Sequence, residues 1–450
     1  MPRTENFTEG KILSPLLKFA APVLLALLLQ AMYGAVDLLV VGQFGSAADV
    51  SAVATGSQIM QTITSVFVGL SMGTTILLGQ KIGQRRGDEA GDVIGGGICL
   101  FALLAVVTTG LMLFVAPGFS ALMQAPAAAF DKTVSYVRIC SSGCLFIVAY
   151  NVLGSIFRGL GDSKTPLITV LIACITNIAG DLLLVGAFHM GVEGAAIATV
   201  LAQTVSVVLC LLIVVRRRDM PFSFSRANIR FHRSVIGRTL RLGFPIALQD
   251  FLVSISFLAI LAIVNGLGLI SSAGVGVAEK LCMFIMLVPS AFMQSMSAFV
   301  AQNIGAGQNG RAKRAMLYGM LSSLACGVVM AYFSFFHGDQ LAGWFARDTQ
   351  VIAAAADYLR AYSIDTLLVS FLFCFIGYFN GCGRTTFVMA QGLTGAFLVR
   401  IPVSYLMSRR AGVSLFYIGL ATPISTVVQI LLCAGYFLWI NRFSKGQLSS

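Results

Sequence analysis

Residues 30–45 read Gln-Ala-Met-Tyr-Gly-Ala-Val-Asp-Leu-Leu-Val-Val-Gly-Gln-Phe-Gly, and they place Asp37 deep inside an apolar run that extends from Ile12 to Val41. A run of this length is long enough to cross a bilayer as a helix. A carboxylate near the middle of a bilayer costs on the order of 3 kcal/mol, so it is rare there and needs a partner. Asp37 is therefore the first candidate for a functional residue.

The whole chain shares the apolar character of this stretch. It has 450 residues, of which 57% are hydrophobic and only 11% are charged, and this composition excludes a water-soluble globular domain. We predict an all-α polytopic membrane protein with twelve transmembrane helices. The apolar segments of sufficient length are residues 13–41, 52–79, 93–116, 133–156, 166–188, 192–215, 236–266, 273–300, 315–336, 351–379, 386–408 and 413–440. We expect no cleavable signal peptide, because the polar start of the chain is followed by an apolar run that lacks a small-residue cleavage site.

The net charge of +12 has a topological explanation. Most of the 30 Lys and Arg residues fall on one set of loops when both termini are placed on the same side, and the positive-inside rule then predicts that both termini are cytoplasmic. We expect no nucleic-acid partner. The ten cysteines lie in or beside apolar segments without a metal-ligand spacing, which is typical of small hydrophobic residues.

The chain contains an internal duplication. Lys18-Phe-Ala-Ala-Pro22 aligns with Arg241-Leu-Gly-Phe-Pro245, Gln80-Lys-Ile-Gly83 aligns with Gln302-Asn-Ile-Gly305, and Arg158-Gly-Leu-Gly161 aligns with Asn380-Gly-Cys-Gly383. We predict an amino-terminal lobe over residues 1–215, an Arg-rich cytoplasmic linker over 216–235 and a carboxy-terminal lobe over 236–450. Each lobe would be a six-helix bundle, and a pseudo-twofold axis along the membrane normal would relate the two.

Four polar residues form a candidate ion site in the amino-terminal lobe. Tyr33 and Asp37 share one helix face at a spacing of four residues, and Asn177 and Asp181 repeat this spacing. Two carboxylates that meet in a low dielectric cannot both stay ionised unless a cation joins them, so the pair can hold a proton. Their oxygens can also coordinate a hard cation such as Na⁺, to which Thr199 would add a further oxygen. The alternative is a hydrogen-bonded pair that only holds helices together, with Thr199 bonded to its own helix.

Other residues are weaker candidates. Asp250 and Asp365 would line a substrate cavity or serve as structurally paired acids. Met60 and Met283 suit an adaptable cavity, although methionines are equally common in cores and on lipid-facing surfaces. The spacing of Asp357 and Arg360 predicts a local ion pair.

The sequence resembles the multidrug and toxic-compound extrusion (MATE) transporters of a larger flippase-like superfamily, over nearly its whole length. The resemblance rests on Tyr33-Gly-Ala-Val-Asp-Leu-Leu-Val-Val-Gly-Gln-Phe-Gly45, Gly79-Gln-Lys-Ile-Gly-Gln84, Phe157-Arg-Gly-Leu-Gly-Asp-Ser-Lys-Thr-Pro166, and Asn177 to Asp181 followed by Gly191-Val-Glu-Gly-Ala-Ala196. Their order and spacing together are specific, and they look closest to the DinF-type or MepA-type bacterial branches.

This resemblance implies a V-shaped pair of six-helix bundles in a bacterial inner membrane. The protein would export amphipathic, often cationic compounds in exchange for Na⁺ or H⁺, as a monomer and without another cofactor. The family's cation site would map onto Asp37, Asn177, Asp181 and Thr199, with Tyr33 beside them. NorM-type members carry further acids in the seventh and tenth helices, but Asp250 and Asp365 lie about one turn earlier, so we do not transfer that role to them.

Three other functions are weighed against antiport. A lipid or lipid-linked oligosaccharide flippase of the same superfamily would favour a strongly basic central cavity, for which only Arg138, Lys280, Arg360 and Arg400 lie inside predicted helices. A polytopic membrane enzyme would need a nucleophile–base pair or metal ligands that the sequence does not offer, so we expect no enzyme. A channel does not suit a two-lobe repeat. The sequence has no Walker A motif, which argues against direct use of ATP.

Overall fold

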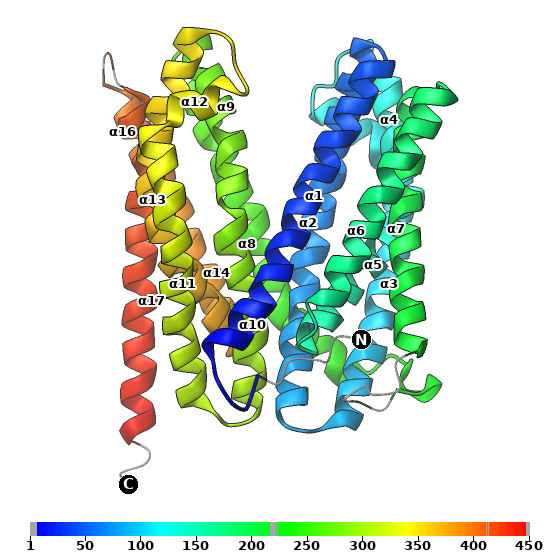
Figure 1. Cartoon of the computed structure of the whole chain (residues 1–450), viewed down its shortest axis with the longest axis vertical. Helices are drawn as coiled ribbons and strands as arrows, with labels where there is room; N and C mark the ends of the chain where they lie inside the picture. The colour runs from blue at the N-terminus through cyan, green and yellow to red at the C-terminus, as the bar shows by residue number, and fades with distance from the viewer. Residues whose placement is uncertain (1–6, 217–221, 223, 411, 413, 447–450) are drawn as a thin grey trace. The chain divides into compact units, whose positions relative to one another are not determined.

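The apolar segments form helices because the bilayer interior offers no water to their backbone N–H and C=O groups, and a helix satisfies these groups within itself. The computed structural model describes residues 7–216, 222, 224–410, 412 and 414–446. In this part of the chain the elements are helices joined by short turns, without a β-strand (Figure 1). The predicted all-α class is confirmed.

The first half of the chain supplies the spans that carry the candidate ion site. Its elements are α1 (Leu13–Phe44), α2 (Ala47–Gly83), α3 (Gly87–Leu122), α4 (Phe130–Ser142), α5 (Cys144–Gly159), α6 (Lys164–Asp181), the π-helix η1 (Leu182–Ala187) and α7 (Gly191–Arg216). A short 3₁₀ turn, η2 (Arg226–Asn228), precedes the second half.

The second half repeats this order with additional breaks. Its elements are α8 (Arg233–Asn265), α9 (Leu269–Ile285), α10 (Leu287–Gly305), α11 (Asn309–Phe336), α12 (Gly338–Gly343), α13 (Thr349–Gly381), α14 (Thr385–Leu393), the π-helix η3 (Thr394–Arg400), α15 (Ile401–Ser408), α16 (Leu415–Gly419) and α17 (Ala421–Gly446). In the described residues, 11 helical runs are long and apolar enough to cross a membrane, and α4 with α5, bent by 55°, completes the 12. The prediction of twelve spans is confirmed.

Packing divides the chain into two compact units whose bounds differ from the duplication. The first unit holds Met1–Gly10, Leu17–Ala247 and Ala301–Gln308, and the second holds Lys11–Leu16, Leu248–Val300 and Asn309–Ser450. The beginning of α8 and the end of α10 therefore pack with the first unit, although they belong to the predicted second lobe. The lobes 1–215 and 236–450 follow the repeat in sequence and stay a prediction, and residues 217–221 and 223 of the predicted linker lie outside the described residues.

A reciprocal backbone contact explains why the end of α10 belongs to the first unit. A Cβ atom added at Gly83 would lie 1.9 Å from the carbonyl oxygen of Gln302, and one added at Gly305 would lie 2.1 Å from the carbonyl oxygen of Gln80. The two copies of the repeated Gln-x-Ile-Gly motif thus pack on each other, glycine against glutamine backbone in both directions. Only glycine leaves room for backbones to approach this closely.

The third repeated motif ends in a glycine in both halves, and the backbone conformation explains why. Gly161 and Gly383, which the duplication aligns, both adopt positive φ angles, of 81° and 75°. They follow α5 and α13, where a left-handed residue ends a helix without the penalty that a Cβ atom would bring. The repeat therefore preserves the same helix end in both halves.

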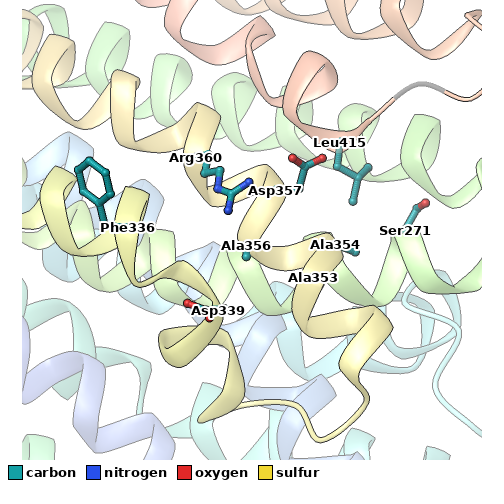
Figure 2. Close-up of a pocket in the computed structure, with 9 residues that line it drawn as sticks. All are labelled: Ser271, Phe336, Asp339, Ala353, Ala354, Ala356, Asp357, Arg360 and Leu415. Atoms are coloured by element: carbon teal, nitrogen blue, oxygen red, sulfur yellow. The ribbon is translucent and has the colours of Figure 1, made fainter.

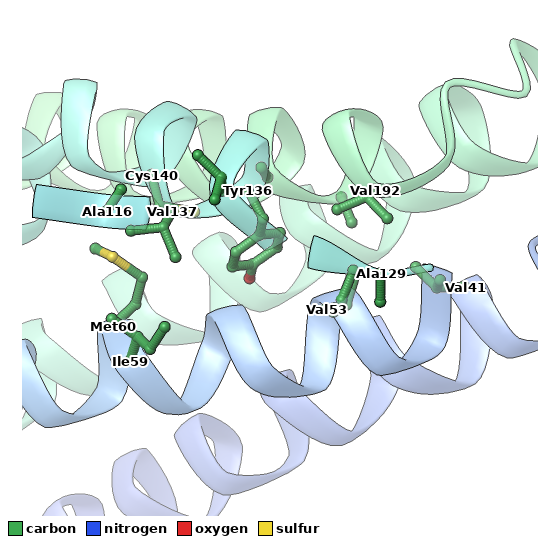
Figure 3. Packing of buried hydrophobic residues seen from close by; sticks show 14 of the residues in the cluster. Val41, Val53, Ile59, Met60, Ala116, Ala129, Tyr136, Val137, Cys140 and Val192 are labelled. Carbon is green, nitrogen blue, oxygen red and sulfur yellow. The ribbon is translucent and has the colours of Figure 1, made fainter. Parts of the chain in front are cut away.

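The interior of the first unit is an apolar core between α2, α4 and α7. Figure 3 shows Val53, Ile59 and Met60 of α2 facing Tyr136 and Val137 of α4. These side chains are all nearly inaccessible. The core packs α2 and α4 against α7, which is one of the helices that carry the candidate site.

The segment before α8 is docked onto α3 within the first unit. Asn228 donates its Nδ2–H to Asp92 Oδ1 at 2.8 Å, and His232 Nε2 lies 3.2 Å from the same oxygen. A Cβ atom at Gly95 would lie 2.0 Å from the carbonyl oxygen of Asn228. The described part of the connection therefore packs closely against α3.

We predict that Gly83→Ala destabilises the protein by about 1–3 kcal/mol, the usual cost of forcing extra volume into a packed contact. The measurement is the midpoint of thermal unfolding of the purified protein. Gly310→Ala is the matched control, because a Cβ atom at Gly310 meets nothing within 4 Å. Equal midpoints for the two variants would contradict the reciprocal contact.

Candidate functional site

Asp37 lies in the C-terminal part of α1, about two turns before the helix ends at Phe44, and it is only 2% exposed. Its carboxylate is directed into the first unit, since Asn177 and Asp181 of α6 and Thr199 of α7 are the groups that interact with it. The structure thus brings together three helices that are distant in sequence. The predicted set of Asp37, Asn177, Asp181 and Thr199 forms one cluster.

Small residues allow α6 and α7 to approach at this cluster. A Cβ atom at Gly180 would lie 3.0 Å from that of Ala198. Gly180 precedes Asp181, and Ala198 precedes Thr199, so the close approach lies next to the polar side chains themselves. Directly after Asp181 the helix widens into the π-helix η1. Short π-segments inside helices occur often at functional sites.

The hydroxyl groups on the edge of the cluster have defined partners. Thr199 Oγ1 lies 3.3 Å from Asp37 Oδ2 and 3.0 Å from the carbonyl oxygen of Ala195, so its single proton is shared between the carboxylate and its own helix. Tyr33 donates its hydroxyl proton to the backbone oxygen of Thr199 at 3.3 Å. Tyr33 therefore lies beside the carboxylates and links α1 to α7, without donating to an aspartate.

Most of the polar atoms at the centre of the cluster lack a hydrogen-bond partner. These atoms are Asp37 Oδ1, both oxygens of Asp181, and the oxygen and nitrogen of the Asn177 amide. Asn177 and Asp181 are each 0% exposed. Unpartnered buried polar groups cost about 1–3 kcal/mol each. A structure that leaves this many of them together is well suited to receive an ion or a proton.

The donor chemistry of the cluster fits a proton or a small hard cation. Two carboxylates, an amide oxygen and a hydroxyl oxygen are the ligands that hard cations prefer. Among the described residues, no group of three or more His, Cys, Asp and Glu side chains is arranged so that it could hold a metal ion. The cluster therefore offers oxygen ligands in place of the nitrogen and sulfur set that a zinc site would use.

Tyr136, which the sequence did not single out, also belongs to this neighbourhood. Its side chain is 2% exposed on α4, its hydroxyl accepts a hydrogen bond from Ser57 Oγ at 3.2 Å, and Asp37 acts on it electrostatically. In the sequence Tyr136 is visible as a tyrosine inside an apolar segment. Its position near Asp37 of α1 depends on how the helices pack, which the sequence does not show. A Cβ atom at Gly56 would lie 2.5 Å from the Tyr136 ring, which shows how close α2 and α4 are here.

The other predicted residues lie apart from this cluster. Met60 is buried in the core of the first unit, and Asp365 is buried in the second unit at 1% exposure, so neither side chain faces an open cavity in this structure. Met283 is 67% exposed, and Asp250 is exposed on α8. A cavity-lining role stays a prediction for these two.

A separate cavity of about 560 Å³ lies within the second unit, among α9, α11, α12, α13 and α16 (Figure 2). It is lined in part by Asp339, Asp357 and Arg360. Asp357 accepts hydrogen bonds from Ser414 Oγ and, at 3.1 Å, from the backbone N–H of Phe416. Among the ion pairs of the described residues none joins Asp357 to Arg360, so the predicted ion pair was wrong. Asp357 instead reinforces the cap of α16, whose N-cap residue is Ser414, because the first N–H groups of a helix need an acceptor.

The comparisons with known proteins bear on the family and the fold. A family model described as MatE matches residues 22–183 and again residues 245–406, and the matches start at the two prolines that the duplication aligns. The chain is 25% identical over 448 residues to the probable multidrug resistance protein YoeA of Bacillus subtilis, covering 98% of this chain and 96% of the relative. It is 28% identical over 414 residues to the probable multidrug resistance protein YpnP of the same organism, covering 90% and 91%.

A solved structure has the same fold. It is titled "Crystal structure of MATE in complex with MaD3S" and superposes with a TM-score of 0.91 over 98% of both chains, at 20% sequence identity. This chain therefore shares its all-helical architecture with a solved protein to which its sequence is only 20% identical.

We predict that Asp37→Asn raises the thermal unfolding midpoint in alkaline buffer without Na⁺, because it removes one of two buried carboxylates that repel each other. Acidification or added Na⁺ should stabilise the wild type more than the variant, since a ligand that binds the folded state shifts the midpoint by mass action. Asp339→Asn, at an exposed carboxylate on α12, is the control and should show neither effect. A variant less stable than wild type under every condition would indicate a purely structural role for Asp37.

Proposed function

Because this chain belongs to the MATE family of multidrug-efflux transporters, we propose that it is a secondary antiporter that exports amphipathic, often cationic compounds in exchange for Na⁺ or H⁺. The observation that carries this proposal is the pair of buried carboxylates, Asp37 and Asp181, with three oxygens that lack hydrogen-bond partners. Ionisable residues inside a membrane are retained chiefly for ion and proton pathways. We propose a multi-pass location in a bacterial inner membrane, with both termini cytoplasmic and the monomer as the working form.

The coupling ion would bind between α1, α6 and α7. A proton would neutralise the carboxylate pair, whereas Na⁺ would be held by the oxygens of Asp37, Asn177, Asp181 and Thr199. Either ion removes the repulsion between the two carboxylates and allows the three helices to pack more closely. The space available to the cargo in the amino-terminal half would then shrink, and the cargo would leave toward the outside.

Coupling requires that the ion bind the two conformations with different affinities. An ion bound equally well in both conformations would shift nothing, and each tenfold preference contributes about 1.4 kcal/mol. Inward movement of one positive charge yields about 2.3 kcal/mol per 100 mV of membrane potential. Exchange of one monovalent ion for one monovalent cationic compound gains nothing from the potential, so the stoichiometry decides how strongly voltage drives export.

The test is ethidium efflux from sealed vesicles, driven separately by a Na⁺ gradient and by a pH gradient. Wild type should export under one gradient, which identifies the coupling ion. We expect Asp37→Asn to lower the rate at least about tenfold, because a positioned charge in a low dielectric is worth more than one factor of ten. Asp339→Asn, an exposed carboxylate on α12, is the control and should export normally.

Two results would count against this proposal. Full activity of Asp37→Asn would remove the carboxylate pair from the coupling mechanism. Absence of wild-type export under both gradients would disfavour cation-coupled drug efflux, and the transfer of a fluorescent lipid between leaflets would then be measured in the same vesicles.

A further inference from the structure

Arg400 is buried inside the second unit, at the end of the π-helix η3, and it is only 6% exposed. Its Nη1 donates a hydrogen bond to Ser256 Oγ of α8 at 3.3 Å, and its guanidinium carbon lies 4.4 Å from the centre of the Phe257 ring. Its Nε has no hydrogen-bond partner. A guanidinium offers only N–H donors and keeps its positive charge, so Arg400 holds an unused donor in a dry interior.

Two hydroxyl groups of the same region are also buried without a hydrogen-bond partner. They belong to Ser404 of α15 and Thr422 of α17, which are 0% and 2% exposed. A serine or threonine inside a helix commonly donates to a carbonyl of its own helix, as Thr426 Oγ1 does to the carbonyl oxygen of Thr422 at 3.1 Å. The hydroxyls of Ser404 and Thr422 make no such bond, so each has a donor available for another group.

The helical register directs these donors toward one another. Ser404 follows Arg400 by four residues on one helical run, a spacing that places both side chains on the same face. On the facing span α17, Ser425 Oγ donates to the carbonyl oxygen of Gly395 at 2.7 Å. Consecutive spans run in opposite directions, so one turn back from Ser425, at Thr422, lies level with about one turn forward from Gly395, close to Arg400.

The duplication assigns these residues to the positions of the ion cluster. The matched ranges 22–183 and 245–406 are equally long and begin at corresponding prolines. In this register Arg400 and Ser404 occupy the places of Asn177 and Asp181, and all four are buried. The second unit therefore repeats the geometry of the cluster with different side chains.

The π-helix η3 and α17 both support this register. The repeated glycines Gly161 and Gly383 correspond at an offset one residue smaller, and η3 lies between them and Arg400. A π-turn closes over five residues instead of four, so it accommodates one additional residue. In the next span Ala421-Thr422 repeats Ala198-Thr199 at the same offset as Arg400 and Asn177.

The two sets have opposite polarity. In the first unit the positions carry the carboxylate of Asp181 and the amide of Asn177, and Asp37 of α1 adds a second carboxylate. The position of Asp37 is taken by Ile260 in α8, so the second unit has neither carboxylate at these places. Oxygen acceptors suit a cation, whereas a guanidinium and hydroxyl groups donate hydrogen bonds to an anion.

The charged group that acts on Arg400 from another helix is Asp365 of α13; Asp250 and Glu279 are not among the groups that act on it. Among the ion pairs of the described residues none joins Asp365 to Arg400. Asp365 therefore reduces the positive potential at the site without occupying its donors. This limits the ligand to a small anion with a single charge, because a larger charge would exceed what the guanidinium compensates.

We propose that Arg400, Ser404 and Thr422 form a binding site for a small monovalent anion such as chloride. The duplicated chain thus holds a cation site in one unit and an anion site at the corresponding place in the other. The inference goes beyond the proposed function, which concerns only the cation of the first unit.

The test is equilibrium dialysis of the purified full-length protein against radioactive chloride, with gluconate as the replacing anion. We expect wild type to bind about one chloride per chain, since the three donor groups make one set. Thr422→Val keeps the shape of the side chain and removes the hydroxyl, and it should weaken binding about tenfold, because hydrogen bonds to charged groups are the stronger ones. Thr426→Val, one turn further along α17, is the matched control and should bind as wild type does.

Arg400→Gln removes the positive charge and should abolish chloride binding. If this variant fails to fold, Ser404→Ala takes its place, because it keeps the guanidinium and removes one donor; it should weaken binding as Thr422→Val does. Two results would overturn the inference: a folded wild type that binds no chloride, and chloride affinity that is the same in wild type and in the folded variants at positions 400, 404 and 422.

The experiment also separates this inference from the proposed function. Asp37→Asn lies in the first unit and should leave chloride binding unchanged while it removes cation coupling. Full efflux activity of Asp37→Asn would count against the proposed function alone, and the chloride measurement would still decide the site in the second unit.

Discussion

The repulsion between two carboxylates in a dry interior is the constraint on which the first unit depends. The close approach of α6 and α7 at Gly180 and Ala198 lies next to Asp181 and Thr199, and Thr199 contacts Asp37 of α1 at 3.3 Å, while the core around Tyr136 packs α2 and α4 against α7. This packing stabilises the first unit enough to offset the cost of several buried polar atoms that have no hydrogen-bond partner. In the proposed mechanism, the binding of a single small ion would change the interactions of three helices at once.

The fold could be predicted from the sequence because membrane-spanning helices are specified locally. Apolar length alone gave the twelve spans, and the repeated motifs around Pro22, Gly83 and Gly161 gave the duplication. The polar residues of the ion cluster were also accessible, since a carboxylate at membrane depth is rare enough to be noticed singly. Their use for ion coupling goes beyond what the sequence and the packing establish, and it stays a prediction.

Features that depend on contacts between distant segments could not be predicted. The spacing of Asp357 and Arg360 favours an ion pair, yet the carboxylate caps α16, which follows it by more than fifty residues along the chain. The flexible side chain of Met60 would suit a cavity, but packing places it in the core. The burial of Arg400 is of the same kind, because charge along a helix does not reveal which face is covered.

The reciprocal contact between Gly83 and Gly305 has a consequence for biosynthesis. The first unit includes Ala301–Gln308, so the ribosome must synthesise six spans and the next two before this unit can close. During that interval the end of α2 lacks the segment that packs on Gly83. The duplicated halves are therefore not successive folding domains: the first to emerge waits for a piece of the second.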